Sequence, residues 1–113
     1  MSSEKTRFTC PDCGGAIEKI TEDGMLQYRC RIGHLYSPES ALLVHAEREE
    51  NTLWTSVVLL EEGAELAEEI AALDSYGDPQ ALLQSAKAKR ELVRHVREAA
   101  MKFPKIARNH SEE

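Results

Sequence analysis

The amino-acid sequence predicts an α+β protein in which a small N-terminal β-hairpin precedes a long antiparallel helical hairpin. Three observations predict this fold. All three cysteines of the 113-residue chain lie within residues 10–30, and His34 follows closely. An Asp-Gly pair in the same region separates two runs of β-prone residues. Beyond Ser37, apolar residues recur every three or four positions, which is the period of an amphipathic helix.

The predicted β-hairpin consists of Ala16–Ile20 and Met25–Arg29, with Asp23-Gly24 in the turn between them. An Asp-Gly pair between such runs is a strong hairpin signal. A hairpin returns the chain to its starting point, so the residues before it and after it become neighbours. It thereby brings together four candidate metal ligands, Cys10, Cys13, Cys30 and His34.

The spacing of these four residues is typical of a zinc ribbon. Cys10 and Cys13 form a C-x2-C pair, and Cys30 and His34 form a C-x3-H pair. Together they make a Cys3His shell. Four protein ligands fill a tetrahedral shell and leave no position for water or substrate, so we expect one structural Zn²⁺.

Three other uses of the cysteines remain open. A thioredoxin-like redox pair places C-x2-C at the start of a helix, whereas Gly14-Gly15 and a hairpin follow here. A disulfide between Cys10 and Cys13 does not suit a cytoplasmic protein. A [2Fe–2S] centre accepts a Cys3His set, but small cluster proteins of this kind open with C-x-C and have a much shorter loop.

Two dipeptides mark helix starts, because Ser37-Pro38 and Asp78-Pro79 each place an N-cap oxygen before a proline at the first helical position. We expect the first helix to end in the turn Asp74–Gly77, and the second to end or kink at Pro104. The short connection makes the two helices antiparallel neighbours. The predicted organisation is a zinc ribbon at residues 1–36, a helical hairpin at 37–110 with a break at 74–78, and a tail at 111–113.

Charge is distributed unevenly along the chain. Residues 38–74 carry ten acidic residues and one basic residue, a net of −9, whereas residues 79–110 carry eight basic and two acidic residues, a net of +6. The two helices should therefore attract each other, and the acidic helix should repel nucleic acid.

Extra apolar side chains widen the helical faces beyond a two-helix seam, so another surface must cover them. These side chains are Leu42, Trp54, Val58, Leu66, Ile70 and Leu83. We expect a homo-oligomer, a dimer that joins through the helices as a four-helix bundle, with the ribbon folding back as the alternative.

The sequence disfavours membrane proteins and enzymes. No run approaches the roughly 20 apolar residues of a membrane helix, and the N-terminal residues lack the apolar stretch of a signal peptide, so we expect a cytoplasmic protein with reduced thiols. No G-x-S-x-G nucleophile motif is present, and we expect His45, His95 and His110 to lie on the solvated surface. The sequence predicts no catalytic residues.

The segments FTCPDCGG and YRCRIGHLYSPESALL, with the tryptophan in LWTSVVLLEE, resemble a C-terminal extension of some bacterial chemotaxis-type protein-glutamate methylesterases. The resemblance covers about residues 7–75 and extends to the second helix in composition only. It implies a shared metal shell at the four candidate ligands. It does not carry the esterase activity across, because that chemistry resides in a separate α/β domain of those enzymes.

From these observations we expect a non-catalytic zinc-binding module for protein interaction or oligomerisation, an accessory in bacterial chemotaxis-like signalling. Two alternatives belong to other classes. One is a nucleic-acid-binding zinc ribbon that uses Arg29, Arg31 and Tyr28, although the acidic helix opposes it. The other is a redox or metal sensor in which oxidation of the thiolates releases the metal.

Overall fold

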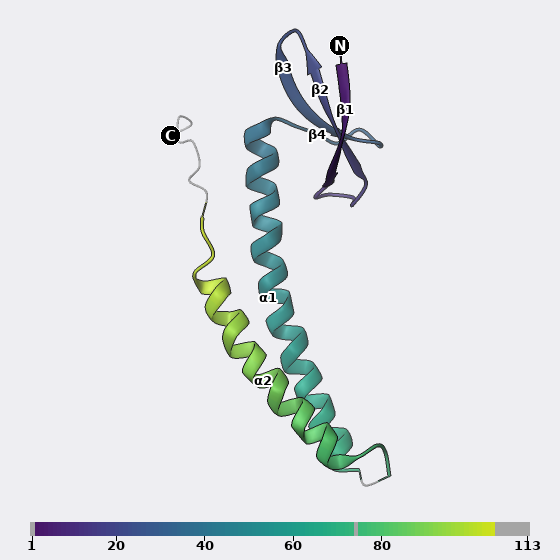
Figure 1. Ribbon diagram of the computed structural model, residues 1–113, viewed down its shortest axis with the longest axis vertical. Coiled ribbons are helices and arrows are strands. Elements are labelled where there is room, and N and C mark those ends of the chain that lie inside the picture. The colour runs from purple at the N-terminus through teal and green to yellow at the C-terminus, as the bar shows by residue number, and fades with distance from the viewer. Residues whose placement is uncertain (1, 74, 106–113) are drawn as a thin grey trace. The chain divides into compact units, whose positions relative to one another are not determined.

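A computed structural model describes residues 2–73 and 75–105 and confirms the α+β fold (Figure 1). The elements are β1 (Ser2–Thr9), β2 (Ala16–Glu22), β3 (Met25–Cys30), β4 (Leu35–Tyr36), α1 (Pro38–Ala71) and α2 (Pro79–Met101). The described chain forms two compact units. The first unit comprises residues 2–48 with Lys105, and the second comprises Glu49–Pro104.

The four strands form one antiparallel sheet in the order β1-β2-β3-β4 (Figure 1). Strands β2 and β3 are the predicted hairpin, with Glu22 opposite Met25 at its closed end. Both residues of the two-residue turn have positive φ angles, 54° at Asp23 and 76° at Gly24. This pair of angles is that of the type I′ turn, whose twist matches the right-handed twist of the flanking strands.

Strand β1, which was not predicted from the sequence, pairs with β2 along the edge of the sheet. Almost all of its side chains are exposed, so the strand has no alternating apolar pattern that would reveal it. Its pairing is interrupted between Lys5 and Thr9. Within this interruption the Thr6 hydroxyl donates to the Ile17 carbonyl at 2.7 Å and accepts from the Phe8 amide at 3.0 Å.

The second helix begins as predicted. Asp78 has an extended backbone, and its side chain accepts a hydrogen bond from the Gln80 amide at 3.0 Å. Gly77, immediately before this cap, takes the expected left-handed conformation with φ 62°. Asp74 of the predicted turn lies outside the described residues, as do His110, the end of the predicted hairpin at 106–110 and the tail at 111–113.

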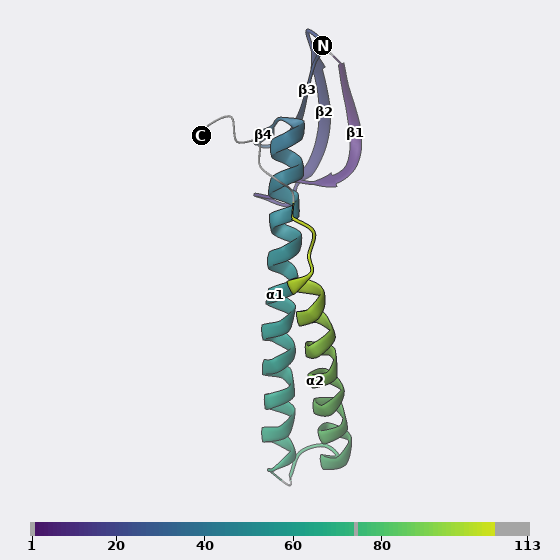
Figure 2. The same ribbon diagram turned by 90° about the vertical axis from the view of Figure 1, so that its left-hand side faces the viewer.

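In the second unit, α2 runs antiparallel to the part of α1 that begins at Glu49 (Figure 2). Small side chains form the contact, because Ala64, Ala67 and Ala86 make up its buried cluster. Two ion pairs close one edge of this contact. Arg90 binds Glu68 through two hydrogen bonds of 2.8 and 3.1 Å, and Arg97 binds Glu61 at 2.8 Å.

These ion pairs confirm that the acidic helix attracts the basic one.

Within residues 2–73 and 75–105, neither helix combines the length and apolar character needed to span a membrane.

Candidate metal centre

The structure brings the four predicted ligands together in the first unit. Cys10 and Cys13 lie in the loop that follows β1, Cys30 ends β3, and His34 directly precedes β4. One donor atom from each residue, Sγ or a ring nitrogen, lies within 4.8 Å of all the others. The cysteines are free thiols; Cys10 and Cys30 are buried, whereas Cys13 is exposed at the rim. This group can hold one metal ion.

Three of the separations are close to the edges expected of a single tetrahedron. Cys13 Sγ lies 3.7 Å from Cys30 Sγ, and His34 Nδ1 lies 3.3 Å from Cys30 Sγ and 3.5 Å from Cys10 Sγ. Sulfur at about 2.3 Å and nitrogen at about 2.0 Å from a tetrahedral centre would be about 3.5 to 3.8 Å apart. The cluster therefore has the size of a shell around one ion.

Two tight turns present the ligands. In the first turn the Cys10 amide donates to the Gly15 carbonyl and the Gly14 amide donates to the Cys10 carbonyl, both at 2.7 Å. In the second turn the Cys30 amide donates to the His34 carbonyl at 3.0 Å, and the Gly33 amide donates to the Cys30 carbonyl at 3.1 Å.

Glycine is required in both turns. Gly14 has φ 77° and Gly33 has φ 106°, in the region that other residues resist.

Hydrogen bonds favour the metal-binding thiolate at two of the three cysteines. Burial opposes ionisation of Cys10, but the Tyr36 hydroxyl and the Cys13 and Asp12 amides outweigh it and lower the pKa of this thiol to about 6. Burial also opposes ionisation of Cys30, and amides from His34 and Ile32 lower its pKa in the same way. One of these donors is the His34 amide, 3.3 Å from Cys30 Sγ.

The other two ligands respond to these thiolates. The Gly15 amide favours the Cys13 thiolate, but partial desolvation of the exposed side chain and the neighbouring sulfurs of Cys10 and Cys30 raise its pKa overall. The same two sulfurs raise the pKa of His34. Negative charge therefore accumulates at the centre of the cluster, and a divalent cation offsets such charge.

Tyr36 connects the metal centre to the core of the first unit. Its hydroxyl lies next to the Asp12 carboxylate and 3.4 Å from Cys10 Sγ, and it shares its single proton between these two acceptors. Burial and the acceptors Asp12 and Cys10 raise the pKa of Tyr36, so the phenol stays protonated. The link between Tyr36 and Asp12 was not predicted, because the sequence carries no signal for it.

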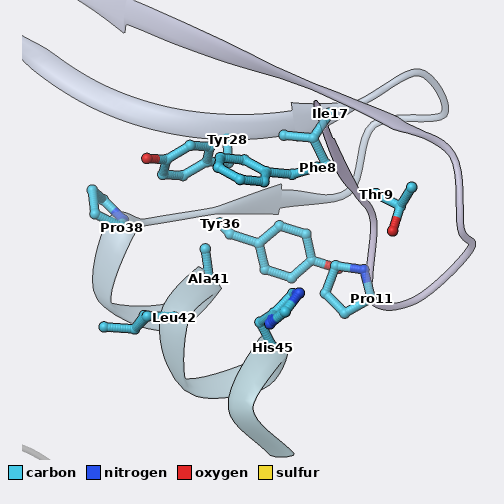
Figure 3. A pocket seen from close by; sticks show the side chains of 10 residues that line it. All are labelled: Phe8, Thr9, Pro11, Ile17, Tyr28, Tyr36, Pro38, Ala41, Leu42 and His45. Carbon is cyan, nitrogen blue, oxygen red and sulfur yellow. The ribbon is translucent and has the colours of Figure 1, made fainter. Parts of the chain in front are cut away.

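Beside Tyr36 lies an apolar recess of about 360 Å³ (Figure 3). The Tyr36 ring lines this recess, and Tyr28 and Phe8 meet edge to face with ring centroids 6.3 Å apart. Phe8 and Leu42 are 56% and 61% exposed, so the recess is bordered by apolar surface. We call this feature the aromatic recess.

The remaining candidate residues lie on the surface. His45 and His95 are exposed as expected, and His45 lines the aromatic recess. Trp54 is 37% exposed, so it is not a core residue of this chain.

Arg29 and Arg31, the two arginines beside Cys30, line one recess with Lys5, and Glu18 lies among them. Arg29 is exposed, but its neighbour across the sheet is Glu18, whose next neighbour is Lys5. Opposite charges therefore alternate across these strands. This pattern disfavours the nucleic-acid-binding alternative, which needs a continuous positive surface.

Comparisons with protein-family models, with curated proteins and with solved structures found no match to this chain.

Proposed function

We propose that this chain is a zinc-stabilised, non-catalytic module for protein–protein interaction. The observation that carries the proposal is the Cys3His cluster, whose four donor atoms lie within 4.8 Å of one another. Thiolate and imidazole are ligands that Zn²⁺ prefers, whereas Mg²⁺ and Ca²⁺ prefer oxygen. Four protein ligands complete a tetrahedral shell, so the zinc would be structural.

The geometry favours a single ion over a two-iron cluster. A [2Fe–2S] centre divides its ligands into two pairs, one for each iron. Here His34 Nδ1 approaches both Cys10 Sγ and Cys30 Sγ, at 3.5 and 3.3 Å, and Cys30 Sγ in turn approaches Cys13 Sγ at 3.7 Å. The four ligands form one group and do not separate into pairs.

The composition of the core supports a structural role for the metal. The buried cluster of the first unit consists of Cys10, Ile17, Cys30 and Tyr36. Two of these four residues are candidate metal ligands, so little apolar surface remains to stabilise the sheet. Domains with so small a core depend on a metal or on disulfides for stability. The free energy of zinc binding contributes directly to their folding.

Exposed apolar surface supports the interaction role. The aromatic recess, with exposed Phe8 and Leu42 at its border, has the apolar lining that accepts a side chain from another protein. We assign its partner to bacterial chemotaxis-like signalling because of the resemblance to the methylesterase extension. The partner would insert an apolar side chain into the recess.

Two measurements test this proposal separately. Zinc content and far-UV circular dichroism of Cys13→Ser test the metal, with Ser40→Ala, an exposed residue of the same unit, as the control. We expect Cys13→Ser to lose zinc and Ser40→Ala to keep it. Full retention of zinc by Cys13→Ser would contradict a Cys3His site.

Isothermal titration with purified chemoreceptor signalling fragments and with a chemotaxis-type methylesterase tests the partner. Binding should weaken in Phe8→Ser and persist in Met25→Ser, because Met25 is an exposed apolar residue of the same sheet that lies outside the recess. If the zinc-loaded wild type binds neither protein, the signalling assignment is wrong while the zinc site stands.

A further inference from the structure

The second unit carries an apolar stripe along α1 and the two residues that follow it, and α2 leaves most of this stripe exposed. It consists of Leu59, Gly63, Leu66, Ile70 and Leu73, and we call it the leucine stripe. Its members alternate in steps of four and three residues, which is the heptad spacing of a helix–helix seam. Leu59, Leu66 and Leu73 are 60%, 57% and 54% exposed.

The leucine stripe is distinct from the seam between the two helices. Ala64 and Ala67 lie in that seam. At 3.6 residues per turn, Leu59 and Leu66 lie about 120° around α1 from these alanines. Glu61 and Glu68, which hold the ion pairs to α2, lie about 80° away in the opposite direction. The stripe therefore occupies the face of the hairpin opposite the ion-paired edge.

Helix α2 contributes to the same face. Lys89 extends its side chain over Gly63, where an added Cβ would meet the lysine methylenes at 3.5 and 3.6 Å. Leu92 lies further around α2 on the side away from Arg90 and Arg97, and it is 50% exposed. The face thus combines an apolar stripe from the acidic helix with apolar surface from the basic helix.

Charge indicates which partner fits this face. From Glu49 to Ala71, α1 carries seven acidic and no basic residues, whereas α2 carries five basic and two acidic residues. A partner of one sign would repel one of the two helices. A second copy offers both signs, and a two-fold rotation about an axis parallel to the helices places each acidic helix against a basic one. At packing distances of about 8 to 10 Å, such charges still interact at physiological salt.

We propose that the leucine stripe and Leu92 form the dimer interface of this protein. Two copies pack these faces together as a four-helix bundle, with α1 of each copy against α2 of the other. The inference rests on the proposed interaction role and names a second copy of this chain as the partner of the hairpin. It does not depend on the identity of the metal or on the signalling partner.

Sedimentation equilibrium of the zinc-loaded chain tests the interface. The wild type should have twice the chain mass of 12.7 kDa. The double variant Leu59→Glu, Leu66→Glu should weaken the dimer by on the order of 30-fold or more, because two hot-spot positions per copy would bury charge. Both positions are exposed within one copy, so circular dichroism should show unchanged helix content. Val58→Glu is the matched control, since Val58 is 53% exposed but lies on another face, and it should remain dimeric.

Salt tests the orientation. When acidic α1 faces basic α2, added salt weakens the dimer, whereas a dimer with α1 against α1 is strengthened by salt. A monomeric wild type, or a dimer that the double variant leaves intact, would overturn the interface. A dimer that tightens with salt would overturn the orientation. Zinc content and titration with the signalling proteins, measured on the same double variant, show separately whether the proposed function holds.

Discussion

The hydroxyl of Tyr36 offers a test of the metal centre by removal of one oxygen atom. Tyr36→Phe retains the buried ring that packs in the core of the first unit. It removes the hydroxyl that lies 3.4 Å from Cys10 Sγ and donates to Asp12. None of the four ligands changes. We therefore expect a folded protein whose Cys10 thiolate is less well supported.

The size of the effect follows from the surroundings of the two acceptors. Loss of a partner that supports a metal ligand typically costs 10- to 100-fold in metal affinity. Asp12 is exposed, so water can replace the lost hydrogen bond at its carboxylate. Cys10 is fully buried, but backbone amides of Cys13 and Asp12 still support its thiolate. We therefore expect a loss in the lower part of that range, about 10- to 30-fold, or about 1.4 to 2 kcal/mol.

Competition with a chromophoric zinc chelator measures this loss. The matched control is Tyr28→Phe, because Tyr28 packs against the same core and the structure shows no hydrogen bond from its hydroxyl to the ligands. Because Tyr36 lowers the pKa of Cys10, its removal should raise that pKa and move acid-induced zinc release to higher pH. An unchanged affinity in Tyr36→Phe, or an equal loss in Tyr28→Phe, would refute this reasoning.

Three further outcomes are expected. Gly14→Ala should destabilise the zinc-loaded protein by about 1 to 2 kcal/mol, because φ is 77° there while the space around a Cβ is open, and thermal unfolding checks this. Chelation of the metal should abolish the sheet signal of residues 2–48 while α2 keeps its helical circular dichroism; simultaneous loss of both would mean one cooperative unit.

Arg90 lowers the pKa of Glu68, so the stability from this pair is complete above the ordinary carboxyl pKa and is lost as the pH falls through the lowered value. Thermal midpoints measured against pH should show the loss of this pair's stability in the wild type and in the control Glu62→Gln. Glu68→Gln lacks the pair and should not show it.

Local patterns made much of this fold predictable. The Asp23-Gly24 turn, the Asp78-Pro79 helix start and the two ligand pairs are each encoded by neighbouring residues, and the structure shows all of these local features. Each depends on backbone preferences or spacing within a few positions.

Features that depend on distant residues were not predictable in this way. Strand β1 is defined by its pairing with β2, and its exposed side chains carry no apolar period. The Tyr36–Asp12 hydrogen bond joins residues 24 positions apart, and only the folded ribbon brings them together. The leucine stripe was predicted only in part, through Leu66 and Ile70. Leu59 and Leu73 differ from core positions only in being exposed, and their exposure depends on where α2 packs.

X-ray absorption at the metal edge, with elemental analysis of the purified protein, identifies the metal that Cys10, Cys13, Cys30 and His34 bind and the atoms that coordinate it. We expect one zinc per chain, bound by three sulfur atoms at about 2.3 Å and one nitrogen at about 2.0 to 2.1 Å. Iron in place of zinc, or a shell with oxygen ligands and fewer than three sulfurs, would contradict this expectation.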